Sequence, residues 1–143
     1  MRRILAIAGS VVLALSLTAP AVVASDNVTG VTVQSATVDK AGLVIVRGTI
    51  YCQNGIGGAE ITGQVTEAIG HKTTIAGGFG GWVECNSNGP SYYETGAYAY
   101  PGIFSSGWAN VQISFGQTEC NDNGGCWFNW WGGNDVYIKV VKR

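Results

Sequence analysis

Catalytic and metal-binding side chains are scarce in this chain. Its only histidine is His71, it has three prolines, and charged residues make up 12% of it. His71 lies between Gly70 and Lys72 without an acidic neighbour to orient it, so a Ser-His-acid triad is not indicated. No two cysteines have the CxxC spacing that is typical of a zinc site. We therefore expect no catalytic residues, no bound metal and no cofactor.

Clusters of basic residues are also missing until Lys139, Lys142 and Arg143 close the chain. Nucleic-acid binding depends chiefly on neutralising phosphates, so we do not expect a nucleic-acid partner. A helix-forming composition is missing as well, because the chain has 22 glycines and is rich in valine, threonine, tyrosine and tryptophan. Glycine disfavours a helix by about 1 kcal/mol per position, and β-branched residues favour strands. We therefore expect an all-β fold.

The beginning of the chain has the pattern of a secretory signal peptide. Arg2 and Arg3 precede an apolar run over residues 4–17, and small residues continue to Ala24. The run of about 14 apolar residues is shorter than the roughly 20 that a membrane helix needs. We expect residues 1–24 to be cleaved and residues 25–143 to form a single secreted domain, extracellular or attached to the cell wall, with no membrane span. Six of the eight basic residues then remain, against nine acidic ones.

Four cysteines in an exported chain predict two disulfides. Three pairings are possible, and we favour Cys52–Cys85 with Cys120–Cys126. The reason is the segment between the last two cysteines, which contains the turn-forming pair Asn123-Gly124 and would bring two strand ends together. An even number of cysteines in an oxidising compartment leaves no free thiol as a nucleophile.

Apolar residues alternate with polar ones in short segments along residues 31–140. The clearest segment is 43–52, in which Val44, Val46, Ile50 and Cys52 share a face that we expect to be core. Turn-forming residues separate the segments, and we interpret the glycine-rich residues 77–81 as a flexible stretch. About seven to nine short strands at this spacing indicate a β-sandwich or a barrel.

Several of these segments resemble a known kind of domain. They are residues 37–42 leading into the strand Gly48-Thr49-Ile50-Tyr51-Cys52, residues 82–85, and a pair of cysteines before the final strand. In this order they resemble small secreted bacterial domains of the immunoglobulin-like β-sandwich type, many of them of unknown function. The resemblance implies an antiparallel sandwich and brings no catalytic motif with it.

Aromatic residues are the feature that points most directly to binding. The candidates are Trp127, Phe128, Trp130, Trp131, Tyr98 and Tyr100. In an extended strand, Trp127 and Trp131 share one face and Phe128 and Trp130 share the other, and only one of these faces can be core. The other face is either covered by loops or exposed, and exposed apolar patches usually mark binding surfaces. Tryptophan and tyrosine suit contacts with sugars or proteins, because each has a broad rigid ring with a polar edge.

Two weaker chemical interpretations remain. Glu84 and Glu94 are flanked by aromatic residues and could form the carboxylate pair of a glycoside hydrolase, although ordinary exposed carboxylates explain the same pattern. Asp122 and its neighbours offer oxygen ligands for calcium, but a short cystine loop already accounts for Asx and glycine residues there.

Taken together, the sequence favours a secreted binding or surface-interaction module without catalysis. Its ligand is unassigned, and cell-wall carbohydrate or a secreted protein are the partners we consider. An exported toxin or inhibitor of another secreted protein is the alternative. A small glycan-acting hydrolase is the third reading.

Overall fold

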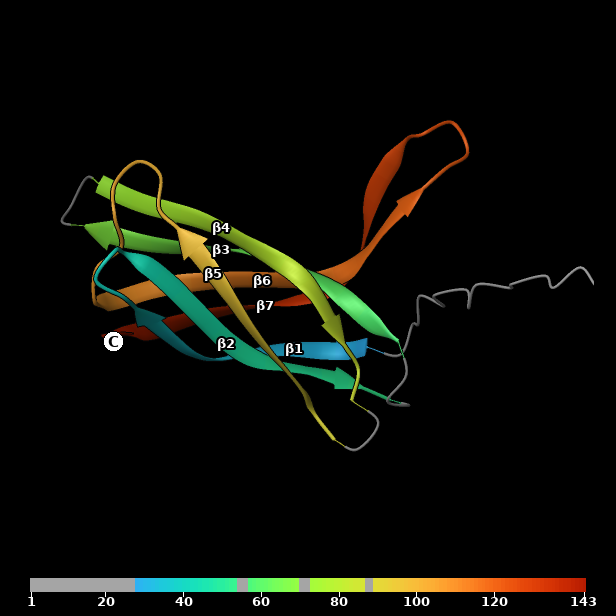
Figure 1. Cartoon of the computed structure of the whole chain (residues 1–143), viewed down its shortest axis with the longest axis horizontal. Coiled ribbons are helices and arrows are strands. Elements are labelled where there is room, and N and C mark those ends of the chain that lie inside the picture. Colours follow the sequence, from blue (N-terminus) through green and yellow to red (C-terminus); the bar gives the residue numbers. More distant parts are fainter. Residues whose placement is uncertain (1–27, 54–56, 70–72, 87–88) are drawn as a thin grey trace, which may run out of the picture.

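The computed structural model describes residues 28–53, 57–69, 73–86 and 89–143. The expected signal peptide over residues 1–24 and His71 lie outside these ranges. Within these ranges every element of regular secondary structure is a β-strand (Figure 1). The strands are β1 (Val28–Val38), β2 (Leu43–Cys52), β3 (Gly58–Ile69), β4 (Thr73–Glu84), β5 (Ser91–Tyr98), β6 (Gly107–Cys120) and β7 (Cys126–Lys142). No helix in the described ranges is long and apolar enough to cross a membrane.

All seven strands belong to one hydrogen-bonded sheet in the order β4-β3-β6-β7-β1-β2-β5. Every neighbouring pair is antiparallel except β1 and β7, which pair in parallel over Ala36–Val38 and Val140–Lys142. The prediction of an all-β fold with two disulfides is confirmed. The prediction of a wholly antiparallel sandwich is wrong at the β1–β7 pair, and a single mixed sheet is not clearly of immunoglobulin type.

The sheet curls until its two edge strands, β4 and β5, lie side by side (Figure 1). The backbone N–H of Tyr100 donates to the carbonyl of Ala76 at 3.1 Å, and Thr95 Oγ1 donates to the carbonyl of Gly80 at 3.3 Å. Curling gives each strand an inner face that is buried and an outer face in contact with solvent. Val44, Val46 and Ile50 are fully buried on the inner side, as the alternation in residues 43–52 predicts.

Tyr93 ties three strands together inside the curl. It lies on β5 opposite Gly48 of β2, and its hydroxyl passes Gly48 to donate to the carbonyl of Thr32 on β1 at 2.7 Å. A Cβ at Gly48 would lie 1.8 Å from that carbonyl oxygen and 2.4 Å from the Tyr93 hydroxyl. Only glycine leaves room for this crossing. Burial of the ring raises the pKa of Tyr93 above the usual range.

The disulfides are Cys52–Cys85 and Cys120–Cys126, the pairing favoured from the sequence. Cys52–Cys85 joins the end of β2 to the residue after β4, and both cysteines pack against the core. Cys120–Cys126 closes the turn between β6 and β7. Two disulfides are typical of proteins in an oxidising, extracellular environment.

Two expectations about local structure are corrected. Residues 77–81 are not a flexible stretch but part of β4, paired with β3 throughout. Residues 127–133, which the sequence suggests as an aromatic insert before the final strand, belong to β7 itself. In both places the pairing with a neighbouring strand outweighs local composition, which a single segment does not reveal.

Candidate functional site

Four large aromatic side chains are exposed on one outer face of the sheet. They are Trp82 (46% exposed), Trp108 (55%), Trp130 (63%) and Tyr137 (67%). Residues directly opposite in an antiparallel pair point to the same side, so the register places all four on the outer side of β4, β3, β6 and β7. We call this surface the aromatic face.

One end of the aromatic face carries Trp82 and Trp130. Both are linked by register through Glu60, since Trp82 pairs with Glu60, Glu60 with Gly116, and Gly116 with Trp130. The Trp82 indole lies over a glycine, because a Cβ at Gly58 would be 2.9 Å from its Cζ2 atom. This end therefore has two indoles separated by two strands, β3 and β6, and by a carboxylate.

The other end carries a stacked aromatic pair. The rings of Trp108 and Tyr137 are 5.2 Å apart between centroids and nearly parallel, with 10° between their planes. Trp108 pairs with Lys139 and Tyr137 with Asn110, so the two rings lie diagonally across β6 and β7. Stacking fixes the orientation of both rings, which lowers the entropy that a ligand-contacting ring loses on binding.

Between the two ends the aromatic face is polar. Asn110 Nδ2 and Gln112 Nε2 donate to the Asp135 carboxylate at 2.7 and 3.2 Å, which holds both amides in place. Asn110 Oδ1 is buried and accepts no hydrogen bond from the described residues. Gln112 lies opposite Gln64 of β3, which extends the row of amides across the sheet. The arrangement supplies hydrogen-bonding groups without an apolar centre.

Glycines leave parts of this middle section without side chains above the backbone. Gly78 of β4 lies opposite Gln64, and Gly80 lies opposite Thr62, on the side away from the core. Gly133 of β7 lies opposite Ser114 of β6. None of these glycines raises a side chain above the backbone, so a flat ligand can approach the sheet closely.

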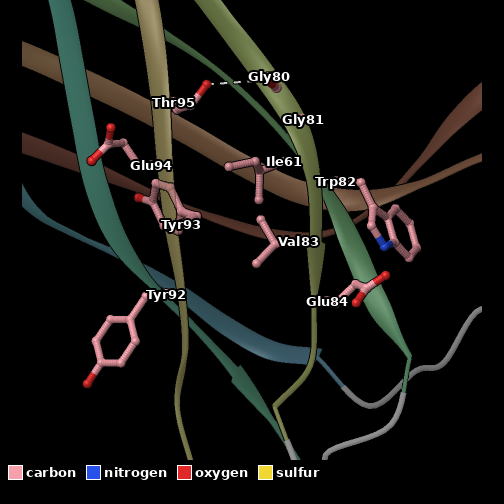
Figure 2. Close-up of a pocket in the computed structure, with 10 residues that line it drawn as sticks. All are labelled: Ile61, Gly80, Gly81, Trp82, Val83, Glu84, Tyr92, Tyr93, Glu94 and Thr95. Carbon is pink, nitrogen blue, oxygen red and sulfur yellow. Dashed lines mark hydrogen bonds between the residues drawn. The ribbon is translucent and has the colours of Figure 1, made fainter.

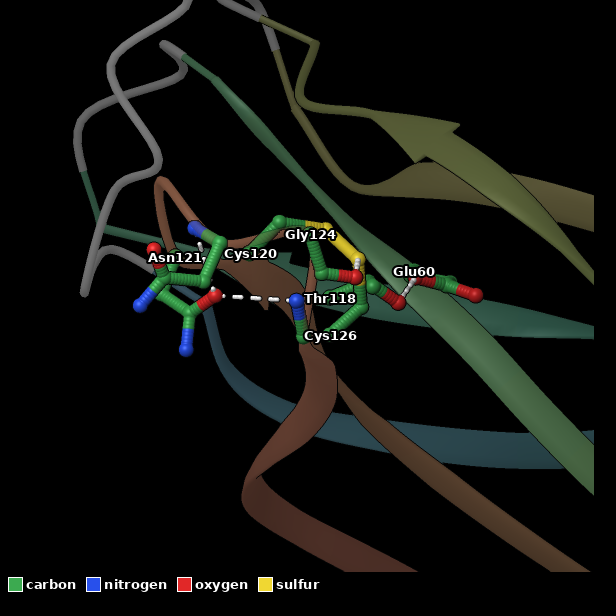
Figure 3. Close-up of a disulfide and its surroundings, with 8 residues drawn as sticks. Glu60, Thr118, Cys120, Asn121, Gly124 and Cys126 are labelled. Carbon is green, nitrogen blue, oxygen red and sulfur yellow. Dashed lines mark hydrogen bonds between the residues drawn. A yellow bond between two sulfur atoms is a disulfide. The ribbon is translucent and has the colours of Figure 1, made fainter.

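The β6–β7 hairpin projects beyond the body of the molecule (Figure 1). Pairing between β3 and β6 ends at Gly116, so residues 117–120 and 126–129 pair only with each other. Thr118 Oγ1 donates to Glu60 Oε2 at 2.6 Å and fastens the base of the hairpin to β3 (Figure 3). At the tip, Asn121 Oδ1 accepts from the backbone N–H groups of Asn123 and Gly125, beside the disulfide. These bonds brace the projecting segment at its base and at its tip.

The four candidate aromatics of residues 127–131 divide between the two sides of this hairpin. Phe128 and Trp130 lie on the aromatic face, edge to face at 5.6 Å between centroids. Trp127 is exposed on the opposite side of the hairpin, because it pairs with Glu119 where no core lies beneath. Trp131 is the extra residue of a β-bulge between Trp130 and Gly132, and it packs half-buried against the core.

The candidates Tyr98 and Tyr100 are exposed but lie elsewhere. Tyr98 is on the outer side of β5 opposite Leu43 of β2, and Tyr100 follows the end of β5. The structure therefore unites Trp130 and Phe128 with Trp82, Trp108 and Tyr137, and not with the two tyrosines. Sequence reasoning missed those three residues. The signal was present, since Trp108 alternates in step with Asn110 and Gln112.

A cleft of about 340 Å³ opens where β4 and β5 diverge, with Ile61, Val83 and Tyr93 between the two strands (Figure 2). Both Glu84 and Glu94 line it, but their side chains extend to opposite sides. The Glu94 carboxylate accepts from Arg47 Nε at 2.6 Å, and Arg47 Nη1 donates to Thr37 Oγ1. Glu94 is thus held on the outer side of β5 by a structural ion pair.

Metal ligands do not gather in the described part of the chain. No three His, Cys, Asp or Glu side chains among these residues lie close enough to hold an ion. The asparagine at the hairpin tip is engaged in capping the turn, which explains the Asx-rich sequence around Asp122.

Compared with protein-family models, with curated proteins and with solved structures, the chain matches none. The geometry of the described residues is therefore the basis for a functional proposal.

Proposed function

We propose that the protein is a secreted, non-catalytic binding module that recognises carbohydrate of a cell wall or cell surface through the aromatic face. Removal of residues 1–24 releases the domain 25–143 in this proposal. The domain is a divergent relative of the small secreted immunoglobulin-like domains, on the strength of residues 48–52 and the two disulfides. The exposed aromatics on a polar outer face of the sheet are the single observation that carries the proposal.

Stacking on sugar rings accounts for both properties of this face. A pyranose ring has an apolar C–H face and hydroxyl groups around its edge. Indole and phenol rings such as Trp130 and Tyr137 match the C–H face, while fixed amides such as Asn110 and Gln112 match the hydroxyls. Exposing four large rings is otherwise unfavourable, because each leaves apolar surface in water.

A depletion experiment tests the proposal. Purified protein is mixed with bacterial cell walls and with insoluble neutral and acidic polysaccharides, and the protein left in solution is measured. A Trp108→Ala/Trp130→Ala variant should lose saturable depletion by the wall. The matched control is Tyr92→Ala/Tyr98→Ala, which removes two rings that are more exposed than those of Trp108 and Trp130 from the outer side of β5. Equal depletion by both variants, or none by wild type on any matrix, contradicts the proposal.

The projecting hairpin favours a second candidate, an exported toxin or inhibitor that inserts the hairpin into a target protein. Trp127 separates this candidate from the first, because it is exposed at the tip but lies outside the aromatic face. The toxin interpretation predicts that purified protein arrests growth of neighbouring strains and that Trp127→Ala abolishes the arrest. The carbohydrate proposal predicts that Trp127→Ala leaves wall binding intact.

A further inference from the structure

We infer that the ligand of the aromatic face is an uncharged polysaccharide whose chain lies along β6 and stacks on aromatic rings at both ends of that face. The inference rests on the proposed function and names the ligand class for the same site. It follows from the separation of the aromatic ends, the chemistry between them and the charge of the surrounding strands.

The two aromatic ends are far apart. Trp108 stands near the start of β6, and Trp130 lies opposite Gly116, which is eight positions further along the same strand. At about 3.3 Å per residue this separation is roughly 26 Å. A single sugar or a disaccharide reaches one end only. A ligand that uses both ends must be a chain of several units that follows the strand.

The section between the ends suits a chain of hydroxyl-bearing rings. Asn110 and Gln112 are fixed by Asp135, and the Asp135 carboxylate and the Gln64 amide are themselves polar groups on the same face. A repeating ligand presents hydroxyl groups at every step, so a row of side-chain amides and a carboxylate meets donors and acceptors along the whole length. The glycines on β4 and β7 let such a chain lie flat.

The charge of the strands excludes an acidic polymer. β3, β4 and β6 contain no lysine or arginine. The face carries the carboxylates of Glu60 and Asp135, and Lys139, beside Trp108, is the one basic residue that the register places there. A polyanion would meet carboxylates at both the centre and one end and a single positive charge at the other.

The distribution of the rings also argues against a protein partner on this face. Binding hot spots in protein interfaces cluster near the geometric centre, in desolvated pockets. Here the rings stand at the two ends, while the centre is polar and open. A ligand that repeats along its length fits this pattern, because it makes the same stacking contact twice.

Titration calorimetry with oligosaccharides of different length tests the inference. The probes are β-1,4-linked oligomers of glucose and of N-acetylglucosamine with about two and about six units, and polygalacturonate as the acidic polymer. In at least one neutral series the longer oligomer should bind at least about tenfold more tightly than the shorter, because the second stacking contact becomes intramolecular. It should also compete with binding to the cell wall, while polygalacturonate should not.

Variants at each end complete the test. Trp108→Ala and Trp130→Ala should each reduce the affinity for the long oligomer to nearly that for the short one, while Tyr92→Ala should leave the length dependence unchanged. The inference is overturned if long neutral oligomers leave wall binding intact, if short and long oligomers bind equally, or if polygalacturonate competes. In each of those cases, wall binding that depends on Trp108 and Trp130 would still support the proposed function. Wall binding that does not depend on these two residues would contradict both the inference and the proposed function.

Discussion

At the scale of single residues, we expect truncation of the Tyr93 side chain to lower the stability of the fold, because this side chain connects three strands. Its hydroxyl donates to the carbonyl of Thr32, and its ring lies in the inner core. Tyr93→Phe removes this hydrogen bond from the core, so we expect the free energy of unfolding in urea to fall by about 1–2 kcal/mol. Tyr92→Phe, at the next position but exposed, should change it by no more than about 0.5 kcal/mol.

Tyr93 should also make the free energy of unfolding depend on pH. Burial raises the pKa of Tyr93 in the folded protein above that of an unfolded tyrosine, which is about 10. The stability that this difference provides is fully present below about pH 10. Above that pH the unfolded chain releases the proton while the folded chain keeps it, so the free energy of unfolding falls by about 1.4 kcal/mol per pH unit. Urea unfolding at several alkaline pH values should show this slope in wild type, and a Tyr93→Phe variant with the same slope would contradict the assignment.

A third prediction at this scale concerns Gly58. Its Cβ would lie 2.4 Å from the carbonyl oxygen of Val83 and 2.9 Å from the Trp82 ring, so Gly58→Ala must displace Trp82 and strain β4. We expect a loss of about 1–3 kcal/mol in unfolding free energy and a shift in Trp82 fluorescence. Gly81→Ala is the matched control, because a Cβ there meets nothing within 4 Å. Similar losses in both variants would mean that the contact with Trp82 is unimportant.

At the scale of elements, alternation alone predicted the core face of β2 but not the length of β4. Val44, Val46 and Ile50 are buried because period-2 patterning is a local property of a strand. The glycines of β4 were misread as flexible because their function is not local. A Cβ at Gly77 of β4 would lie 2.3 Å from the carbonyl oxygen of Tyr98, and a Cβ at Gly63 of the neighbouring β3 would lie 2.4 Å from the Phe79 ring of β4. Glycine at these positions permits close approach between strands.

The candidate site likewise has some residues that local alternation predicts and others that depend on the strand order. Phe128 and Trp130 were placed on one side of their strand from alternation, and the structure has them there. Trp82, Trp108 and Tyr137 join them only through the order β4-β3-β6-β7, which brings together strands separated by up to about 50 residues in the chain. No local pattern specifies that order.

The β6–β7 hairpin carries a prediction about its own stability. Beyond Gly116 it has two strands only, and an isolated pair of strands is marginally stable in water. Removing the tip disulfide with Cys120→Ser/Cys126→Ser should therefore loosen residues 117–129 before it affects the core. We expect amide hydrogen exchange to accelerate more in this segment than at Val44 or Val46, whose exchange follows the global free energy of unfolding. A uniform acceleration across all strands would show that the hairpin unfolds only with the whole molecule.

At the scale of the whole molecule, the curl of the sheet depends on how its two edges are joined. Ladder pairing does not connect β4 to β5, because the sheet order begins with one and ends with the other. The edges are held instead by the hydrogen bonds of Thr95 and Tyr100 and by the core beneath them. Cys52–Cys85 adds a covalent link between the residue after β4 and the end of β2, the neighbour of β5. The patterns of the individual strands therefore do not predict the closure of the sheet, because closure depends on a few contacts between residues that are distant in sequence.

Removing Cys52–Cys85 should therefore cost more than removing Cys120–Cys126. The first disulfide closes a loop with a sequence separation of 33 residues and the second one of 6. Restriction of the unfolded chain then gives about 3.7 kcal/mol for the first and about 2.2 kcal/mol for the second. We expect Cys52→Ala/Cys85→Ala to lower the free energy of unfolding in urea by at least about 1.5 kcal/mol more than Cys120→Ala/Cys126→Ala does. Both cysteines of the first pair also pack against the core, which adds to this difference. An equal or reversed order would mean that the end of β2 and the end of β4 stay together without the covalent link.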